Sequence, residues 1–181
     1  MSPVIVVCTG PESSGKSTLS QLLAEALQVP LVEEQARTYL DSKDAGRNGY
    51  LPSDILEIGR RQSDQEKRCA ETNPIFVCDT DHQVLRIWWQ EKYGPHPAPF
   101  NHAGHLFMQV HRFYLLCHPD FPWAPDPLRE HPNDRDRLLR RYEIDCKRQQ
   151  LKYFSARGQV EKRVDDALAW LQDQPKIVKT T

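Results

Sequence analysis

The amino-acid sequence predicts a three-layer α/β domain, in which helices cover both faces of a parallel β-sheet. Short apolar runs typical of strands alternate with longer segments of helical periodicity. The first apolar run is almost entirely β-branched, as in strands that are buried on both faces of a sheet. A chain of 181 residues has the length of one ordinary domain, so we expect residues 1–181 to share a single core.

The first half of the domain is predicted from four segments, two strands and two helices. Residues 4–8 form the β-branched run, and a glycine-rich turn follows it directly. The next segment carries an apolar stripe at helical spacing, formed by Leu19, Leu22, Leu23, Ala26 and Leu27. A short strand is expected at 30–33, followed by helical sequence at 35–42.

The second half of the chain continues the alternation. A long helix is expected next, with Ser53 or Asp54 as its N-cap and Pro74 just after its end. The remaining expected strands are 75–78, 113–117 and 152–155. The remaining expected helices carry their apolar side chains within 84–88, 138–146 and 160–171. Strands that are joined through helices form right-handed crossovers, which makes the predicted sheet parallel.

Composition narrows the classes of partner. The 24 Lys and Arg residues balance 25 Asp and Glu residues, so no overall basic field favours nucleic acid or an anionic membrane. No apolar run approaches the length of about 20 residues that crosses a bilayer, and no signal peptide is recognisable, which predicts a cytoplasmic protein. Five cysteines without a C-x-x-C pair are expected to be reduced. The oligomeric state is not predicted.

A phosphate-binding pattern, G-x-x-x-x-G-K-[ST], lies between the first strand and the first helix. Its residues are Gly10-Pro11-Glu12-Ser13-Ser14-Gly15-Lys16-Ser17. In this pattern backbone N–H groups surround a phosphate, the lysine reaches the β and γ oxygens, and the final hydroxyl ligates Mg²⁺. We therefore expect ATP and Mg²⁺ as cofactors, with ATP bound by Gly10, Glu12, Ser13, Ser14, Gly15, Lys16, Ser17 and Thr18. The alternative is a glycine-rich turn that merely precedes a helix.

A carboxylate near the metal is expected at the end of the third strand. Asp79 follows the apolar run 75–78 directly, so we expect it to act with Ser17 in holding Mg²⁺. Asp81 is the second candidate. Its alternative function is to cap the helix that begins near His82.

Ordered motifs along the chain resemble the nicotinamide riboside kinase domain of NadR-type proteins. The motifs are the phosphate loop, Glu34-Gln35-Ala36-Arg37, Asp79-Thr80-Asp81, Pro122-Trp123-Ala124-Pro125-Asp126-Pro127-Leu128-Arg129, and Gly158 with Arg163. The resemblance spans nearly the whole chain. It implies an ATP-dependent small-molecule kinase with a five-stranded parallel sheet.

The resemblance also implies functions for single residues. Glu34 is expected to align the acceptor hydroxyl and Arg37 to hold the acceptor, because both follow the second strand at the edge where open α/β sheets bind ligands. Asp81 is a further expected acceptor ligand, and Arg163 an expected nucleotide ligand. The alternative for Glu34 and Arg37 is a surface ion pair on one helical turn.

A proline-rich, aromatic segment at about 120–141 is predicted to be a helical lid over the phosphates. Arg129 and Arg135 are its expected catalytic residues, offsetting charge on the transferring group. Arg137, Arg140 and Arg141 alternate with acidic residues and are expected to form a solvated helix face.

The NadR-like family has an aromatic residue on either side of the glutamate that corresponds to Glu34. This chain has Glu33 and Gln35 at those two positions. An acceptor ring could instead be contacted by one of several aromatic residues, namely Tyr39, Trp88, Trp89, Tyr93 or Trp123. The sequence His102-Ala103-Gly104-His105 matches H-x-G-H, but it lies mid-chain, away from the first strand, so we expect neither nucleotidyl transfer nor zinc binding from it.

Three functions remain open at the level of sequence. The leading one is phosphorylation of a small hydroxyl acceptor, the 5′-hydroxyl of nicotinamide riboside or a similar nucleoside. The second keeps this chemistry with another nucleoside, a nucleotide or a vitamin. The third is an NTPase that acts as a nucleotide-dependent regulatory switch.

Overall fold

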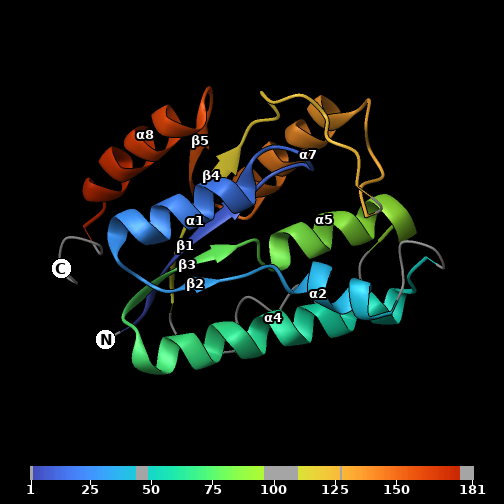
Figure 1. Ribbon diagram of the computed structural model, residues 1–181, viewed down its shortest axis with the longest axis horizontal. Helices are drawn as coiled ribbons and strands as arrows, with labels where there is room; N and C mark the ends of the chain where they lie inside the picture. Colours follow the sequence, from blue (N-terminus) through green and yellow to red (C-terminus); the bar gives the residue numbers. More distant parts are fainter. Residues whose placement is uncertain (1, 44–48, 96–109, 127, 176–181) are drawn as a thin grey trace.

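The computed structural model describes residues 2–43, 49–95, 110–126 and 128–175 (Figure 1). The strands are β1 (Val4–Thr9), β2 (Leu31–Val32), β3 (Ile75–Asp79), β4 (His111–Cys117) and β5 (Lys152–Ala156). The helices are α1 (Lys16–Leu27), α2 (Gln35–Ser42), α4 (Pro52–Thr72), α5 (His82–Tyr93), α7 (Arg135–Arg148) and α8 (Val160–Gln172). The predicted strands and helices are confirmed, with small changes at their ends.

The five strands form one parallel sheet in the order β2-β3-β1-β4-β5. The central strand β1 is buried along its whole length, which explains its β-branched sequence. Its loop leaves the sheet between β3 and β4, because β1 pairs with both of these strands. This is the position at which open parallel sheets bind ligands.

Helices cover both faces of the sheet, as predicted. On one face, alternate β1 residues such as Val4 and Val6 pack with Leu19 and Leu23 of α1 and with Leu171 of α8. On the other face, the opposite residues of β1 pack towards α4, while α5 and α7 meet the end of β4. Figure 1 shows α4 on the opposite side of the sheet from α8.

Two local predictions were wrong. Leu22 is 36% exposed and Ala26 is also exposed, whereas Ser20 and Ala24 are buried, because α1 turns a narrower stripe towards the sheet. The N-cap of α4 is Leu51 rather than Ser53 or Asp54.

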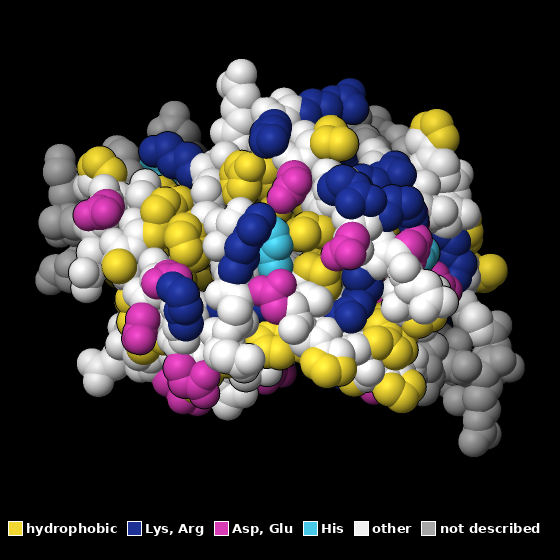
Figure 2. All heavy atoms as spheres, turned by 90° about the horizontal axis from the view of Figure 1, so that it is seen from above, with side chains coloured by type: hydrophobic (Ala, Val, Ile, Leu, Met, Phe, Trp, Pro, Cys, Tyr) yellow, Lys and Arg dark blue, Asp and Glu magenta, His cyan; other side chains and the backbone are white. Residues whose placement is uncertain are grey.

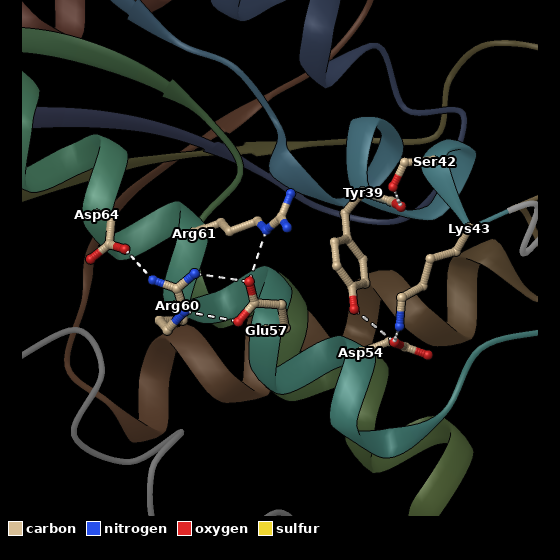
Figure 3. A network of polar contacts seen from close by, with 8 residues as sticks. All are labelled: Tyr39, Ser42, Lys43, Asp54, Glu57, Arg60, Arg61 and Asp64. Carbon is tan, nitrogen blue, oxygen red and sulfur yellow. Dashed lines mark hydrogen bonds and ion pairs between the residues drawn. The ribbon is translucent and has the colours of Figure 1, made fainter.

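Asp54 instead acts from inside the first turn of α4. Its carboxylate accepts a hydrogen bond from the Leu51 N–H at 2.7 Å and another from the Tyr39 hydroxyl at 2.8 Å. Lys43 forms an ion pair with the same carboxylate, so the junction of α2 and α4 is built around one acidic group (Figure 3). These contacts hold down the pKa of Asp54 to about 2, with the Lys43 hydrogen bond as the largest cause. Nearby on α4, Arg60 forms ion pairs with Glu57 and Asp64 at the surface. Surface ion pairs of this kind add little to the free energy of unfolding.

The mixture of charges on the surface and the state of the cysteines agree with what the composition predicts. On the face seen in Figure 2, Lys and Arg side chains are interspersed with acidic and hydrophobic ones. All five cysteines are free thiols, and four of them are buried. None of the helices in the described parts of the chain is long and apolar enough to cross a membrane.

Candidate active site

The phosphate loop connects β1 to α1, and its backbone requires glycine at both ends. Gly10 has a φ of +133°, and a Cβ atom there would lie 2.6 Å from the carbonyl oxygen of Cys117. Gly15 has a φ of +81° and is the N-cap of α1, with the ring of Phe121 lying against it. These positions let the loop curl at the positive end of the α1 helix dipole, where phosphate binds favourably.

Lys16 folds back over the loop. Its Nζ donates to the carbonyl oxygens of Gly10 at 3.1 Å and Pro11 at 2.8 Å. The Ser14 hydroxyl also donates to the Pro11 carbonyl, at 2.7 Å, which tightens the turn. The loop is therefore shaped by its own side chains, with a lysine ammonium held above it to meet an anionic group.

Asp79 lies where the sequence predicts a metal ligand. It ends β3 beside the phosphate loop, close enough for the Ser17 hydroxyl to lower the pKa of its carboxyl. Burial, the largest cause, raises the pKa of Asp79 overall. Oδ1 of Asp79 is buried and has no hydrogen-bond partner among the described residues. A buried carboxylate oxygen beside a hydroxyl is a suitable oxygen donor pair for Mg²⁺, which takes its other ligands from water and phosphates.

Asp81 lies outside the lining of the cavity, as Asp79 also does, and its carboxylate is engaged elsewhere, so its function as an acceptor ligand stays a prediction. Oδ1 accepts from the Gln83 N–H at 2.8 Å and caps α5, as the alternative interpretation held. Oδ2 accepts from the Tyr114 hydroxyl at 2.8 Å and faces the Arg112 guanidinium. Thr80, between the two carboxylates, has a φ of +73°, and this left-handed turn points them in different directions.

A cavity of about 240 Å³ extends from the phosphate loop towards α2, α5 and α7. All of the predicted phosphate-loop ligands, Gly10 to Thr18, line it. Its apolar lining is formed by Ala36, Leu40, Val84, Ile87, Trp88, Leu128, Leu138 and Tyr142. Its charged lining beyond the phosphate loop is formed by Glu34, Arg37, Glu91, Asp126 and Arg129, with His131 beside them.

Glu34 and Arg37 both line this cavity from the start of α2. Burial raises the pKa of the Glu34 carboxyl, and the nearby charges of Lys16 and Arg37 oppose this effect. Arg37 pairs with Asp126 of the lid segment at 2.9 Å. The predicted surface pair between Glu34 and Arg37 is therefore not the arrangement found, because Glu34 faces the cavity and Arg37 reaches across it.

Within the predicted lid, 120–141, the described residues 120–126 and 128–134 form irregular backbone, and the first half of α7 follows. Arg129 lines the cavity, and its Nη1 donates to the carbonyl oxygen of Ala124. Arg135 is not among the cavity residues. Its guanidinium donates to the carbonyl oxygens of Ser13 at 3.1 Å and Phe121 at 2.9 Å, so it ties the lid to the phosphate loop.

The remaining arginines lie on α7 and α8. Arg137 is exposed and pairs with Asp134, as expected for a solvated face, and Arg137 and the half-buried Arg141 also pair with Glu91 of α5. Arg140 is exposed, as expected. Arg163 is 1% exposed and donates to the carbonyl oxygens of Ser14 at 2.7 Å and His118 at 2.8 Å. It therefore holds the backbone of the phosphate loop in place, and its predicted direct contact with nucleotide stays a prediction.

Among the predicted aromatic candidates, Trp88 lines the cavity. The Tyr39 hydroxyl is engaged at the α2–α4 junction, and Trp89 packs edge-on against Tyr93. Trp123 is half-buried in the lid segment and outside the lining of the cavity. The H-x-G-H sequence at 102–105 lies outside the described residues.

Sequence reasoning missed Glu91 and Asp126 as cavity residues. Glu91 lies in the last turn of the amphipathic helix α5, and only the packing of α7 against α5 brings Arg137 and Arg141 to it. Asp126 was noticed as part of a motif, but its pairing with Arg37 joins residues far apart in the chain. Neither contact has a local sequence signal.

The comparison with protein families agrees with this geometry. A family model described as an AAA domain matches residues 5–163, from β1 to Arg163. The chain belongs to this AAA-domain family. The matched region includes the phosphate loop, Asp79 and the lid segment. A search among curated protein sequences finds no match.

Solved structures with a similar fold include NadR proteins, a thymidylate kinase and a deoxyadenosine kinase. A NadR protein in complex with NR has 19% identity and a TM-score of 0.69, with 95% of this chain and 51% of that chain covered. A thymidylate kinase from Ehrlichia chaffeensis has 15% identity and a TM-score of 0.64, with 95% and 100% covered. A deoxyadenosine kinase from M. mycoides has 12% identity and a TM-score of 0.64, with 94% and 100% covered.

At these identities the likeness establishes the fold, a P-loop kinase fold. The chain spans about half the length of the NadR protein it resembles, since 51% of that protein is covered.

Proposed function

We propose that this protein transfers the γ-phosphate of ATP to a hydroxyl group of a small nucleoside, with nicotinamide riboside as the leading candidate. The observation that carries the proposal is that one cavity joins the phosphate loop to Glu34. Lys16 would hold the β and γ phosphates at one end of this cavity, and the acceptor would lie at the other.

Glu34 is the residue best placed to orient the acceptor hydroxyl. It faces the cavity, and the charges around it include Lys16 and Asp79 of the phosphate end. A carboxylate there can accept the hydrogen bond of a hydroxyl and fix its oxygen for in-line attack. Arg129 would offset negative charge that develops on the transferring group. Ser17 and Asp79 would hold Mg²⁺, which supplies charge neutralisation on the phosphates when bound.

The charges of the acceptor end favour a nucleoside over a nucleotide. A dianionic phosphate on the acceptor would meet the carboxylates of Glu34, Glu91 and Asp126. Arg37 is already paired with Asp126, and Arg129, the other arginine of the lining beyond the phosphate loop, is assigned to the transferring group. An uncharged or cationic acceptor avoids this repulsion. Trp88 and the apolar lining around it provide a surface for a planar ring.

The proposal is tested by a coupled ADP-release assay with nucleosides, nucleoside monophosphates and vitamins as acceptors. We expect stimulation by nucleosides, greatest for nicotinamide riboside, and none by the monophosphates. Glu34→Gln should keep ATP affinity and lose about 10²-fold or more of the stimulated rate, the usual contribution of a positioned general base.

Glu33→Gln is the matched control, because Glu33 is the exposed neighbour of Glu34. It should retain the wild-type rate. If no hydroxyl compound stimulates ATP turnover and Glu34→Gln is indistinguishable from wild type, the kinase proposal fails and a nucleotide-dependent switch becomes the better account.

A further inference from the structure

An acidic residue inside the phosphate loop contacts the lid. Glu12 is the third residue of the loop pattern, and its Oε1 accepts a hydrogen bond from the backbone N–H of Glu130 at 3.0 Å. Its Oε2 accepts from the backbone N–H of His131 at 3.3 Å. One carboxylate therefore binds two consecutive N–H groups of the lid segment, 118 and 119 residues away in the chain.

These two N–H groups directly follow Arg129. The Arg129 N–H donates to the carbonyl oxygen of Asp126 at 3.0 Å, and the Leu128 N–H donates to the Asp126 side chain at 2.9 Å. These bonds define the turn that precedes Arg129, whereas Glu12 fixes the backbone that follows it. The backbone is therefore fixed on both the N-terminal and the C-terminal side of Arg129, which keeps this arginine in the lining of the cavity.

The remaining contacts of this stretch point away from the loop. The Glu130 side chain accepts from the hydroxyl of Tyr50, which precedes α4, at 3.1 Å and pairs with Lys92 of α5 at 2.7 Å. Glu12 is therefore the side chain through which the phosphate loop holds residues 130 and 131.

A carboxylate in a phosphate loop carries an electrostatic cost. It repels the phosphates of a bound nucleotide, and this repulsion weakens binding unless donors satisfy the carboxylate. Here the two lid N–H groups supply those donors, and such charge-assisted hydrogen bonds are stronger than neutral ones. The same contact brings the positive charge of Arg129 to the cavity.

We propose that Glu12 is a positioning residue: it docks the lid onto the phosphate loop and so places Arg129 at the transferring phosphate. This inference rests on the proposed phosphoryl transfer for its catalytic consequence. The docking itself does not depend on that function, so the two can fail separately.

Limited digestion with trypsin tests the docking without any activity. Trypsin cleaves after arginine, and the N–H of the Arg129–Glu130 peptide bond is the one that Glu12 holds. Glu12→Ala should increase the rate of cleavage after Arg129 by about tenfold or more, as measured by mass spectrometry of the fragments. The denaturation midpoint of the variant should equal that of the wild type. Glu12→Gln, which keeps one acceptor oxygen, should be cleaved at a rate between those of Glu12→Ala and wild type.

Glu25→Ala is the matched control, because Glu25 is an exposed acidic residue on α1, away from the lid. It should leave cleavage after Arg129 unchanged. Equal cleavage in wild type and Glu12→Ala would overturn the docking function.

A double-mutant cycle tests the catalytic consequence in the acceptor-stimulated assay. If Glu12 acts through Arg129, Glu12→Ala and Arg129→Ala should each lower kcat more than they change the KM for ATP, and the double variant should lose no more than Arg129→Ala alone. Additive losses in the double variant, or a loss for Glu12→Ala confined to ATP affinity, would overturn the inference and make Glu12 a nucleotide ligand.

Discussion

Replacement of Arg163 by methionine separates support of the phosphate loop from contact with nucleotide. The guanidinium is buried and donates to three carbonyl oxygens, those of Gly158, Ser14 and His118. Asp120 provides a fourth acceptor at 3.2 Å. Methionine keeps much of the apolar volume and removes every donor, so these acceptors lose their partner at once.

The expected loss can be worked from these contacts. Each hydrogen bond to a charged group contributes about 1.5–3 kcal/mol, but losses within one cluster are not additive. We therefore expect Arg163→Met to lower the free energy of unfolding by about 3–5 kcal/mol, the usual cost of breaking a buried charged group's contacts. For a chain of this length that corresponds to roughly 6–20 °C in the melting temperature.

Chemical denaturation measures the loss of stability, and calorimetric titration measures ATP affinity. Together they distinguish support of the phosphate loop from direct contact with nucleotide. Arg163→Lys should recover only part of the stability, because an ammonium cannot reach several acceptors in different directions. Arg68→Met is the control: Arg68 is exposed on α4, away from the phosphate loop, and its replacement should change stability by less than about 0.5 kcal/mol. If Arg163→Met loses ATP affinity while its denaturation midpoint stays at the wild-type value, the supporting function is refuted and Arg163 binds nucleotide.

Three other predictions follow from the carboxyl end of β3. Asp79→Asn should raise the Mg²⁺ requirement and lower turnover at unchanged stability. Asp81→Asn should lower the free energy of unfolding by about 1–3 kcal/mol, because it weakens the contact with Arg112. The reverse ranking would identify Asp81 as the metal ligand. Thr80→Gly should change stability by less than about 1 kcal/mol in urea denaturation, because relief of left-handed strain offsets the added backbone freedom of glycine; a loss above about 2 kcal/mol would show that the Thr80 side chain matters more than its backbone. Burial lowers the pKa of His82 to about 4, below the ordinary value of 6.5, so stability is complete above pH 6.5 and falls as the pH drops towards 4, by roughly 3 kcal/mol. Denaturation midpoints between pH 7 and pH 4.5 check this last point, since His82→Gln should show a shallower fall than wild type, and equal slopes would contradict it.

The sequence by itself determined the fold and the phosphate loop. A β-branched run such as 4–8 is a local signal of a strand buried on both faces, and it is confirmed in β1. The G-x-x-x-x-G-K-[ST] pattern also acts locally, because its glycines allow the backbone angles that the loop needs at Gly10 and Gly15. The position of Asp79 at the carboxyl end of β3 was predictable for the same reason, since it closes a local apolar run, and its function as a metal ligand stays a prediction.

Only the tertiary structure decided what several charged side chains do. Arg163 contacts Ser14 across 149 residues of chain, and Glu12 contacts Glu130 across 118. No periodicity or spacing records such contacts, because they arise when separate loops meet at the edge of the sheet. The difference between Asp79 and Asp81 is of the same kind. Their residue type and place in the chain are nearly equal, but the left-handed turn at Thr80 directs one carboxylate to the phosphate loop and the other into the core between α5 and β4, where Tyr114 and Arg112 bind it.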